Sequence, residues 1–217
     1  MAQDGSQAQS PQGDGLLIIA CGALAHEIMA LRRANAWDQL QVRCLPAELH
    51  NRPEKIPGAV RALIHSSREQ YRSIFVAYGD CGTGGLLDVV LREERVERLP
   101  GAHCYEFFAT GPVFAALAEA EPGTFYLTDF LLQQFDRLVI RGLGLDRHPE
   151  LFELYFGNYR RLVYLAQAPD ANYRAQAQAI AGRMGWTFEY RETGYGALEA
   201  RLAAAVAGNE KVVTWHR

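Results

Sequence analysis

Several signatures that assign a function directly are missing from this sequence. No two of its four cysteines form a CxxC pair, so the zinc-ribbon pattern is absent. No glycine-rich loop carries the lysine of a P-loop, and no cluster of carboxylates offers a magnesium site. We therefore do not expect a phosphoryl-transfer enzyme.

Strong charge of one sign and long apolar runs are also absent. The net charge is -3, which gives no electrostatic footprint for nucleic acid. Neither a secretory core nor a run long enough to cross a bilayer is present. We therefore expect a cytoplasmic protein with no nucleic-acid or membrane partner. Thiols stay reduced there, so four cysteines favour a metal site or catalysis over disulfides.

Short apolar runs alternate with segments of helical periodicity along most of the chain, and 49% of the 217 residues are hydrophobic. Such alternation is typical of a parallel sheet with right-handed crossovers. We predict an α/β fold, with a mainly parallel sheet and helices on both faces, Rossmann-like and divisible near residue 123 into two pseudo-symmetric halves. The predicted strands are 16–20, 40–45, 73–78, 96–99, 125–128, 162–167 and 187–192, with 211–216 as an edge strand.

The composition predicts one α/β domain over residues 16–207. Residues 1–15 are rich in glutamine, serine and glycine, and we expect a disordered leader there. Residues 208–217 are expected to be a C-terminal tail.

Three cysteines stand where a predicted strand ends. Cys21 follows the first strand, Cys81 lies in the turn after the third, and Cys104 follows the fourth. The carboxyl ends of parallel strands meet at one edge of a sheet, where open α/β folds bind ligands. We therefore expect these thiols to surround one crevice, and thiolates with an imidazole are ligands for zinc or iron.

The expected imidazole is His50, just past the second strand, although a role in a helix-capping loop is equally open. We predict Cys81, Cys104 and His50 as inner ligands and Cys21 as the fourth. A small buried residue at a strand–helix crossing is almost as good an interpretation of Cys21. The predicted metal is zinc, with iron or an iron–sulfur cluster as the alternative. His103, next to Cys104, is expected to pack or to hydrogen-bond.

The turn at residues 79–85 contains four glycines in seven residues and leads into a predicted helix. Glycine permits positive φ and a close approach of backbone to ligand. We therefore predict that Gly82, Thr83, Gly84 and Gly85 bind a cofactor. The alternative is a tight turn with an inert cysteine. Asp80 is expected either to accept a hydrogen bond from a metal-bound histidine or to cap the helix.

Other polar residues have simpler interpretations. Cys44 lies inside a predicted strand and is expected to behave as a small hydrophobic residue. His26 and His65 fall on predicted helices and are expected to face solvent or to be satisfied. Asp129 is expected to be an N-cap, and residues 146–149 an ion-paired loop.

Five segments together resemble a prokaryotic family catalogued as domain of unknown function 1638. They are CGAL at 21–24, LHNRP at 49–53, DCGTGG at 80–85, HCYEFF at 103–108 and YFGNY at 155–159. The resemblance extends over nearly all of residues 16–202. Family members resemble components that accompany corrinoid-dependent methyl transfer and folate metabolism, so the resemblance implies a role in one-carbon metabolism. The layout is also similar to the half-domains that hold iron–sulfur clusters in 2-hydroxyacyl-CoA dehydratases.

These observations lead us to expect a metal-dependent methyltransferase that acts on a small molecule, with a corrinoid protein or methyltransferase subunit as its partner. Two alternatives stay open. One is a non-catalytic accessory or metal-handling component of a methyltransferase complex, which docks through apolar residues at 151–159. The other is a cysteine-dependent hydrolase with Cys81 as nucleophile and His50 or His103 as base.

Overall fold

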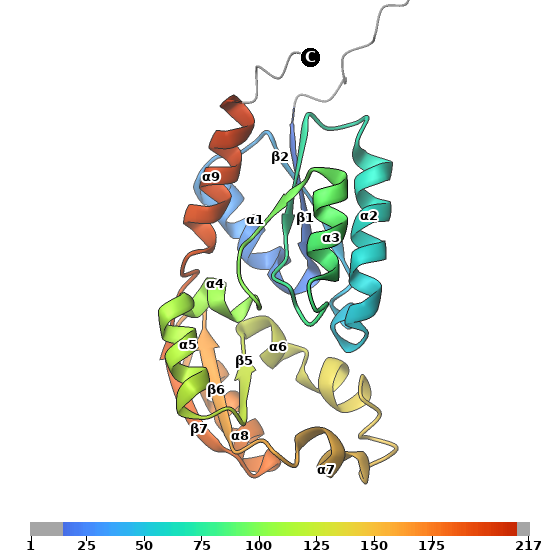
Figure 1. Ribbon diagram of the computed structural model, residues 1–217. Helices are drawn as coiled ribbons and strands as arrows, with labels where there is room; N and C mark the ends of the chain where they lie inside the picture. Colours follow the sequence, from blue (N-terminus) through green and yellow to red (C-terminus); the bar gives the residue numbers. More distant parts are fainter. Residues whose placement is uncertain (1–14, 212–217) are drawn as a thin grey trace, which may run out of the picture.

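The computed structural model describes residues 15–211, except for the side chains of 209–211, and within that range the strands form two parallel sheets (Figure 1). The first sheet has the order β2-β1-β3-β4 and the second the order β5-β6-β7. The strands of the first sheet are β1 (Leu16–Cys21), β2 (Leu40–Leu45), β3 (Ser73–Ala77) and β4 (Glu97–Arg98). Those of the second are β5 (Thr124–Leu127), β6 (Arg161–Ala166) and β7 (Thr187–Glu192).

Strand β1 is the most deeply buried element of the first sheet. It is paired with β2 on one side and β3 on the other, and all six of its residues are buried. A strand enclosed between helical layers reads as a continuous apolar run, as its sequence LLIIAC does. β2 is an edge strand with mostly half-buried or exposed residues.

Helices cover both faces of the first sheet, as Figure 1 shows. Helix α1 (Ala25–Ala34) lies with α9 (Leu198–Lys211) on one face, and α2 (Ile56–Ser67) lies with α3 (Leu86–Glu94) on the other. The 3-10 helix η1 (Gly22–Leu24) precedes α1, and two more, η2 (Ala47–Asn51) and η3 (Pro53–Lys55), precede α2.

The second sheet buries alternate side chains against different helices. Tyr126, Val163 and Leu165 pack with the α4–α5 segment, whereas Leu162 and Tyr164 pack with α8. This is the period-2 alternation of a strand with two buried faces. The helices are α4 (Tyr105–Ala109), α5 (Gly111–Ala120), α6 (Asp129–Gln133), the π-helix η4 (Asp136–Arg141), α7 (Leu151–Phe156) and α8 (Ala171–Met184).

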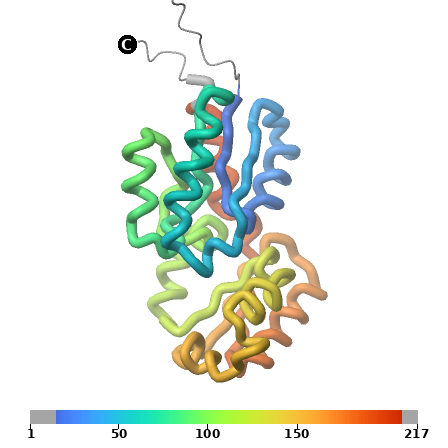
Figure 2. The backbone as a smooth tube through the Cα atoms, turned by 90° about the vertical axis from the view of Figure 1, so that its right-hand side faces the viewer, coloured from blue at the N-terminus to red at the C-terminus, as the bar shows by residue number. Residues whose placement is uncertain are grey.

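The chain leaves the second sheet and returns to the first. Leu198, Leu202 and Val206 of α9 join the same core as β1. Figure 2, seen from the side, shows the two lobes and the red C-terminal helix alongside the first. The lobe around the first sheet therefore contains both an N-terminal part of the chain and α9, so a single cut of the chain does not separate the two lobes.

The predicted α/β class with parallel strands is confirmed, and the second sheet begins at Thr124, beside the predicted division near residue 123. The strands form two sheets and not one, because β4 is only two residues long and the chain leaves the sheet at Pro100 and Gly101. The single domain over 16–207 stays a prediction.

The helical segment at 129–141 is divided into α6 and η4. Lys211 belongs to α9 and not to an edge strand. The rest of that predicted strand, with most of the predicted leader and tail, lies outside the described residues. Among residues 15–211 no helix has both the length and the apolar character needed to span a bilayer.

Two glycines before α9 provide a matched test of how this helix is joined to the core. Gly194 and Gly196 both have a left-handed φ, of 56° and 52°, but a Cβ on Gly194 meets nothing within 4 Å. A Cβ on Gly196 would collide with the carbonyl groups of Phe107 and Phe108. We expect Gly194→Ala to cost about 1 kcal/mol from backbone strain alone, and Gly196→Ala to cost more than about 2 kcal/mol. Urea unfolding of both variants measures the difference, and equal losses would contradict the close approach.

Candidate functional site

The carboxyl edge of the first sheet gathers the four residues predicted as ligands. Cys21 ends β1, His50 lies in η2 after β2, Cys81 follows β3, and Cys104 stands before α4. The Sγ atom of Cys21 lies 3.8 Å from Nδ1 of His50. The thiol of Cys104 interacts electrostatically with those of Cys81 and Cys21. We call these residues, with His103, the thiol–imidazole cluster.

Cys21 is held by its place at the start of a helical turn. It is buried, and its Sγ accepts a hydrogen bond of 3.3 Å from the backbone N–H of Ala23. Burial raises the pKa of Cys21 to about 12, and the Ala23 N–H opposes this rise because it stabilises the thiolate. Without a cation, the thiol is protonated at neutral pH.

Cys81 has an unusual backbone conformation for a residue with a side chain. Its φ is 52°, in the left-handed region that favours glycine. Burial raises the pKa of its thiol to about 11, while hydrogen bonds from the backbone of Gly79 and Cys104 act in the opposite direction. Conformational strain of this kind is often retained at functional sites.

The segment before Cys104 runs directly along the turn that holds Cys81. The N–H groups of Asp80 and Cys81 donate to the carbonyls of Gly101 and Ala102 at 3.1 and 2.9 Å. A Cβ on Gly79 would lie 3.1 Å from the backbone of His103, so a glycine is needed there. This contact places Cys81 and Cys104 next to each other.

The glycine-rich turn is organised from within by Asp80. Its carboxylate accepts hydrogen bonds from the Thr83 hydroxyl and from the N–H groups of Gly84 and Gly85, at 2.6 to 3.0 Å. Partial burial acts to raise the pKa of Asp80, but these bonds outweigh it and the pKa is lowered. The backbone N–H groups of Gly84 and Gly85 already donate to Asp80, so they are not free to bind a cofactor as the turn now stands. The predicted cofactor role of residues 82–85 stays a prediction.

His50 has the environment of a neutral imidazole with one nitrogen free. Its Nδ1 lies 3.0 Å from the carbonyl oxygen of Ala47, to which an N–H on Nδ1 donates. The lone pair is then on Nε2, the arrangement that second-sphere carbonyls impose on metal-binding histidines. Burial lowers the pKa of His50, so the ring is neutral at pH 7. The ring also stacks on Tyr78, with centroids 6.2 Å apart.

His103 and Cys104 form a neutral pair. Cys104 Sγ lies 3.6 Å from His103 Nδ1, and the imidazole stacks on Tyr105 with a centroid distance of 4.1 Å. Burial lowers the pKa of His103 to about 4 and raises that of Cys104 well above its usual value. A thiol donating to an imidazole fits these directions, and His103 hydrogen-bonds and packs as predicted.

Two polar residues at the cluster were not found from the sequence. Oε2 of Glu27 is buried and has no hydrogen-bond partner among residues 15–211, and the buried hydroxyl of Tyr78 has only a weak interaction there, with the thiol of Cys21. Tyr78 neighbours Cys21 and Cys81, and Glu27, on α1, is 3% exposed and interacts electrostatically with Cys104. Glu27 is an acidic residue on a buried helical face, a signal that the sequence does contain. Buried polar atoms left without a partner call for a ligand, water or ion.

The second lobe contacts the loop that carries His50 through a hydrogen bond between a side chain and the backbone. The side-chain amide of Asn51, next to His50, donates to the carbonyl of Leu138 in η4 at 3.2 Å. π-helical turns are often found at functional sites. The predicted N-cap role of Asp129 is wrong, because Thr128 caps α6. The Asp129 carboxylate instead accepts from the Tyr164 hydroxyl and from two backbone N–H groups near the end of β6.

The cluster contains donor atoms that suit a metal ion, but these atoms are not arranged around a common point. Three thiols and one imidazole match the ligand chemistry of zinc. Yet among residues 15–211 no three His, Cys, Asp or Glu side chains are already placed to hold an ion. The ligand set Cys21, His50, Cys81 and Cys104 therefore stays a prediction, and binding would require the side chains to turn towards one point.

The remaining predictions have mixed outcomes. Cys44 lies in β2 as expected, but it is exposed because β2 is an edge strand, so its interpretation as a small buried residue is wrong. His26 is exposed, and His65 is an exposed partner of Glu94. In the predicted docking segment, Leu154 and Tyr155 are 75% and 43% exposed, whereas Phe156 is buried.

Comparison with known proteins finds one related family. A family model described as a protein of unknown function, DUF1638, matches residues 44–202, which include His50, Cys81 and Cys104 but not Cys21. No curated protein and no solved structure matches the chain.

The burial of the cluster predicts a clear order of thiol reactivity. We expect Cys44 to react first with a disulfide reagent such as DTNB at neutral pH, because it is exposed whereas the other three thiols are buried. Burial raises the thiol pKa at all four positions, and it raises those of Cys21 and Cys81 to about 12 and 11. Native Cys44→Ser protein should react slowly, and faster as the pH rises towards 11. Rapid reaction of two or more thiols in that variant at neutral pH would contradict the burial.

His103 predicts a loss of stability in acid. Its pKa is about 4 in the folded chain against an ordinary 6.5, so the unfolded chain takes up the proton first. Stability should fall as the pH drops from 6.5 to 4, by roughly 3 kcal/mol for this group. His103→Phe keeps a ring on Tyr105 and removes the titration, which should flatten the loss. Urea unfolding at several pH values measures it, and an unchanged slope in His103→Phe would contradict a buried neutral imidazole at this position.

Proposed function

The chain belongs to the DUF1638 family of proteins of unknown function, and we propose that its thiol–imidazole cluster is a cytoplasmic zinc centre acting in methyl-group metabolism. The proposed ligands are Cys21, His50, Cys81 and Cys104, with iron or an iron–sulfur cluster as the alternative occupant. The supporting observation is that three buried free cysteines and a neutral imidazole with an unused Nε2 converge at one sheet edge.

The surroundings of the sulfur atoms favour negative charge once a cation is present. Backbone N–H groups donate to the sulfur atoms of Cys21 and Cys81, and hydrogen bonds of this kind stabilise the thiolate form. The protein alone does not reach that form, because burial holds the thiol pKa values near 11 and 12. A zinc ion there would supply Lewis acidity and hold its thiol ligands as thiolates at neutral pH.

Tyr78 and Glu27 supply polar atoms that a bound substrate can use. Burial raises the pKa of the Glu27 carboxyl, which favours its protonated form, so it can donate a hydrogen bond. The Tyr78 hydroxyl is fully buried beside Cys21 and is a second donor. Within residues 15–211 Oε2 of Glu27 has no hydrogen-bond partner and the Tyr78 hydroxyl has only a weak interaction with the Cys21 thiol, so a ligand at the cluster would satisfy both groups.

Closure on a metal would require the cysteine sulfur atoms to turn and the His50 ring to present Nε2, because the nitrogen that now lies near Cys21 is Nδ1. A cysteine has a single side-chain torsion, and exchange among its staggered rotamers repositions the sulfur without moving the backbone. The backbone of Cys81 and Cys104 is already fixed by the hydrogen bonds between their segments. The positions of these ligands would therefore be set by the fold, and their orientation by the metal.

The hydrolase alternative has less support. A cysteine nucleophile needs a lowered pKa or an adjacent base. The pKa of Cys81 is raised, and the imidazoles of His50 and His103 contact Cys21 and Cys104 instead. The accessory alternative rests on the exposed Leu154 and Tyr155 of α7, a surface too small to choose a partner.

Metal content is the direct test of the centre. We expect protein purified anaerobically to bind one equivalent of zinc or iron, and Cys81→Ser to lose most of it while keeping its circular dichroism spectrum. Cys44→Ser removes an exposed thiol and should keep the metal. Elemental analysis with cobalt substitution, whose thiolate charge-transfer bands depend on the number of sulfur ligands, checks both variants. Equal metal in Cys81→Ser and wild type would remove Cys81 from the ligand set.

The methyl-transfer role is tested separately. A deletion strain should grow poorly on methylated amines or betaines and normally on an unrelated carbon source. Purified protein should support methyl transfer with cobalamin and a thiol or folate acceptor, and Cys81→Ser should lower the rate at least about tenfold. Normal growth on every methyl donor, with neither transfer nor corrinoid-protein binding, would reject this role and leave the metal centre to be judged on its own.

A further inference from the structure

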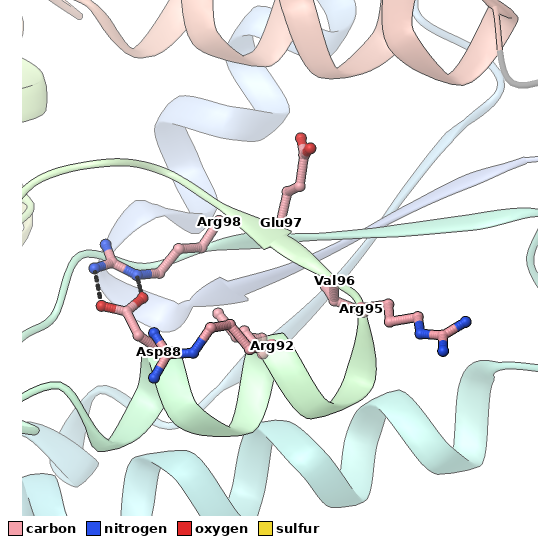
Figure 3. Close-up of a pocket in the computed structure, with 7 residues that line it drawn as sticks. Asp88, Arg92, Arg95, Val96, Glu97 and Arg98 are labelled. Atoms are coloured by element: carbon pink, nitrogen blue, oxygen red, sulfur yellow. Dashed lines mark hydrogen bonds and ion pairs between the residues drawn. The ribbon is translucent and has the colours of Figure 1, made fainter.

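A cavity lies at the opposite edge of the first sheet from the thiol–imidazole cluster. Its volume is about 700 Å³, within the usual range for small-molecule sites. Its walls include Leu16 and Ser73, which begin β1 and β3, together with β4 and one face of α9. A smaller cavity of about 370 Å³ between α3 and β4 shares Arg95, Val96, Glu97 and Arg98 with it (Figure 3).

Arginines dominate the charge of the larger cavity. Five line it, and among residues 15–211 Glu97 is the one acidic residue that does so: the arginines are Arg68, Arg72, Arg95, Arg98 and Arg201. Two of the five are neutralised. Arg98 is held by both carboxylate oxygens of Asp88, as Figure 3 shows, and Arg68 pairs with Glu94 at 2.7 Å.

The other three guanidinium groups are unpaired. Arg72, Arg95 and Arg201 have no side-chain hydrogen bond or ion pair with any residue that the structure describes. They come from the loop before β3, the end of α3 and the first turns of α9, so the fold alone brings them together. Like charges gathered in one cavity repel one another, and an anion bound between them would relieve that repulsion.

Arg95 stands where a glycine would be easier to accommodate. It is the C-cap of α3 with φ of 54°, the left-handed conformation in which helices commonly end on glycine. Arginine there carries a backbone cost that glycine avoids. Its side chain lines both cavities, which gives the arginine a reason to be present.

The floor of the cavity is apolar. Ile74, Phe75 and Ala205 line it and pack on the core of the first sheet. Tyr71 adds a second aromatic ring and itself carries the guanidinium of Arg43 at 5.4 Å. The cavity thus combines an apolar surface with cationic groups at its rim.

We propose that this cavity binds a small organic anion with at least two phosphate or carboxylate groups on an apolar or aromatic body. The guanidinium fork matches such oxyanions in bidentate fashion. Arg72, Arg95 and Arg201 hold the anionic groups, and the apolar floor receives the body. The site is separate from the proposed metal centre, because the two lie at opposite ends of the parallel strands.

Isothermal titration of the full-length protein tests this site with three probes in magnesium-free buffer. ATP and benzene-1,3,5-tricarboxylate carry an aromatic body with phosphates or carboxylates, and inorganic pyrophosphate carries the charge alone. We expect ATP or the tricarboxylate to bind with a Kd of about 1 mM or tighter, and pyrophosphate to bind more weakly. Affinity should fall as salt is added.

Two variants and one control identify the residues. Arg95→Gly removes a guanidinium and relieves the backbone strain, so it should fold at least as stably and bind at least about tenfold more weakly. Arg72→Ala combined with Arg201→Ala should abolish measurable binding. Arg147→Ala makes the same charge change on an exposed loop and should bind like wild type.

Three results would overturn the proposal. They are no binding of any probe, an equal loss in Arg147→Ala, or pyrophosphate binding as tightly as ATP and the tricarboxylate. Binding of heparin or RNA with none of the small probes would mean a surface for a polyanion and would equally reject a small-molecule site.

Discussion

The parallel pairing of β1 between β2 and β3 is the constraint on which the rest of the structure depends. It places the ends of these strands at one edge of the sheet and their beginnings at the other. The thiol–imidazole cluster lies at the first edge, and the arginine-lined cavity at the second. Because β1 is buried along its whole length, a one-residue slip in register would change the environment of both.

Burial gives the cluster its chemical character. Cysteines in a cationic surrounding are reactive, whereas these thiols are held neutral by desolvation and their neighbouring imidazoles are held neutral for the same reason. A soft metal ion binds imidazoles in their neutral form, and it displaces the protons of thiols as it binds. Among residues 15–211, Oε2 of Glu27 has no hydrogen-bond partner and the Tyr78 hydroxyl interacts weakly with the thiol of Cys21, so both remain available to a ligand.

The second lobe and α9 hold the first sheet from two sides. Asn51 joins the His50 loop to η4, and Gly196 lets the chain pass against α4 before α9 returns to the core of β1. These contacts set the position of the loops that carry His50 and Cys104. Changes in the second lobe can therefore alter the cluster without touching it.

The sequence carried the signals for the α/β class and for most strands, and it predicted that Cys21, His50, Cys81 and Cys104 follow successive strands, because apolar periodicity and strand direction are local properties of the chain. It did not show that β5 begins a separate sheet or that Cys44 is exposed, because edge positions depend on which strands pair. The proximity of Glu27 and Tyr78 to the thiols depends on the tertiary structure, which also brings together Arg72, Arg95 and Arg201 from distant parts of the chain. Electrostatic environment depends on distances between elements, and no pattern along the sequence encodes those distances directly.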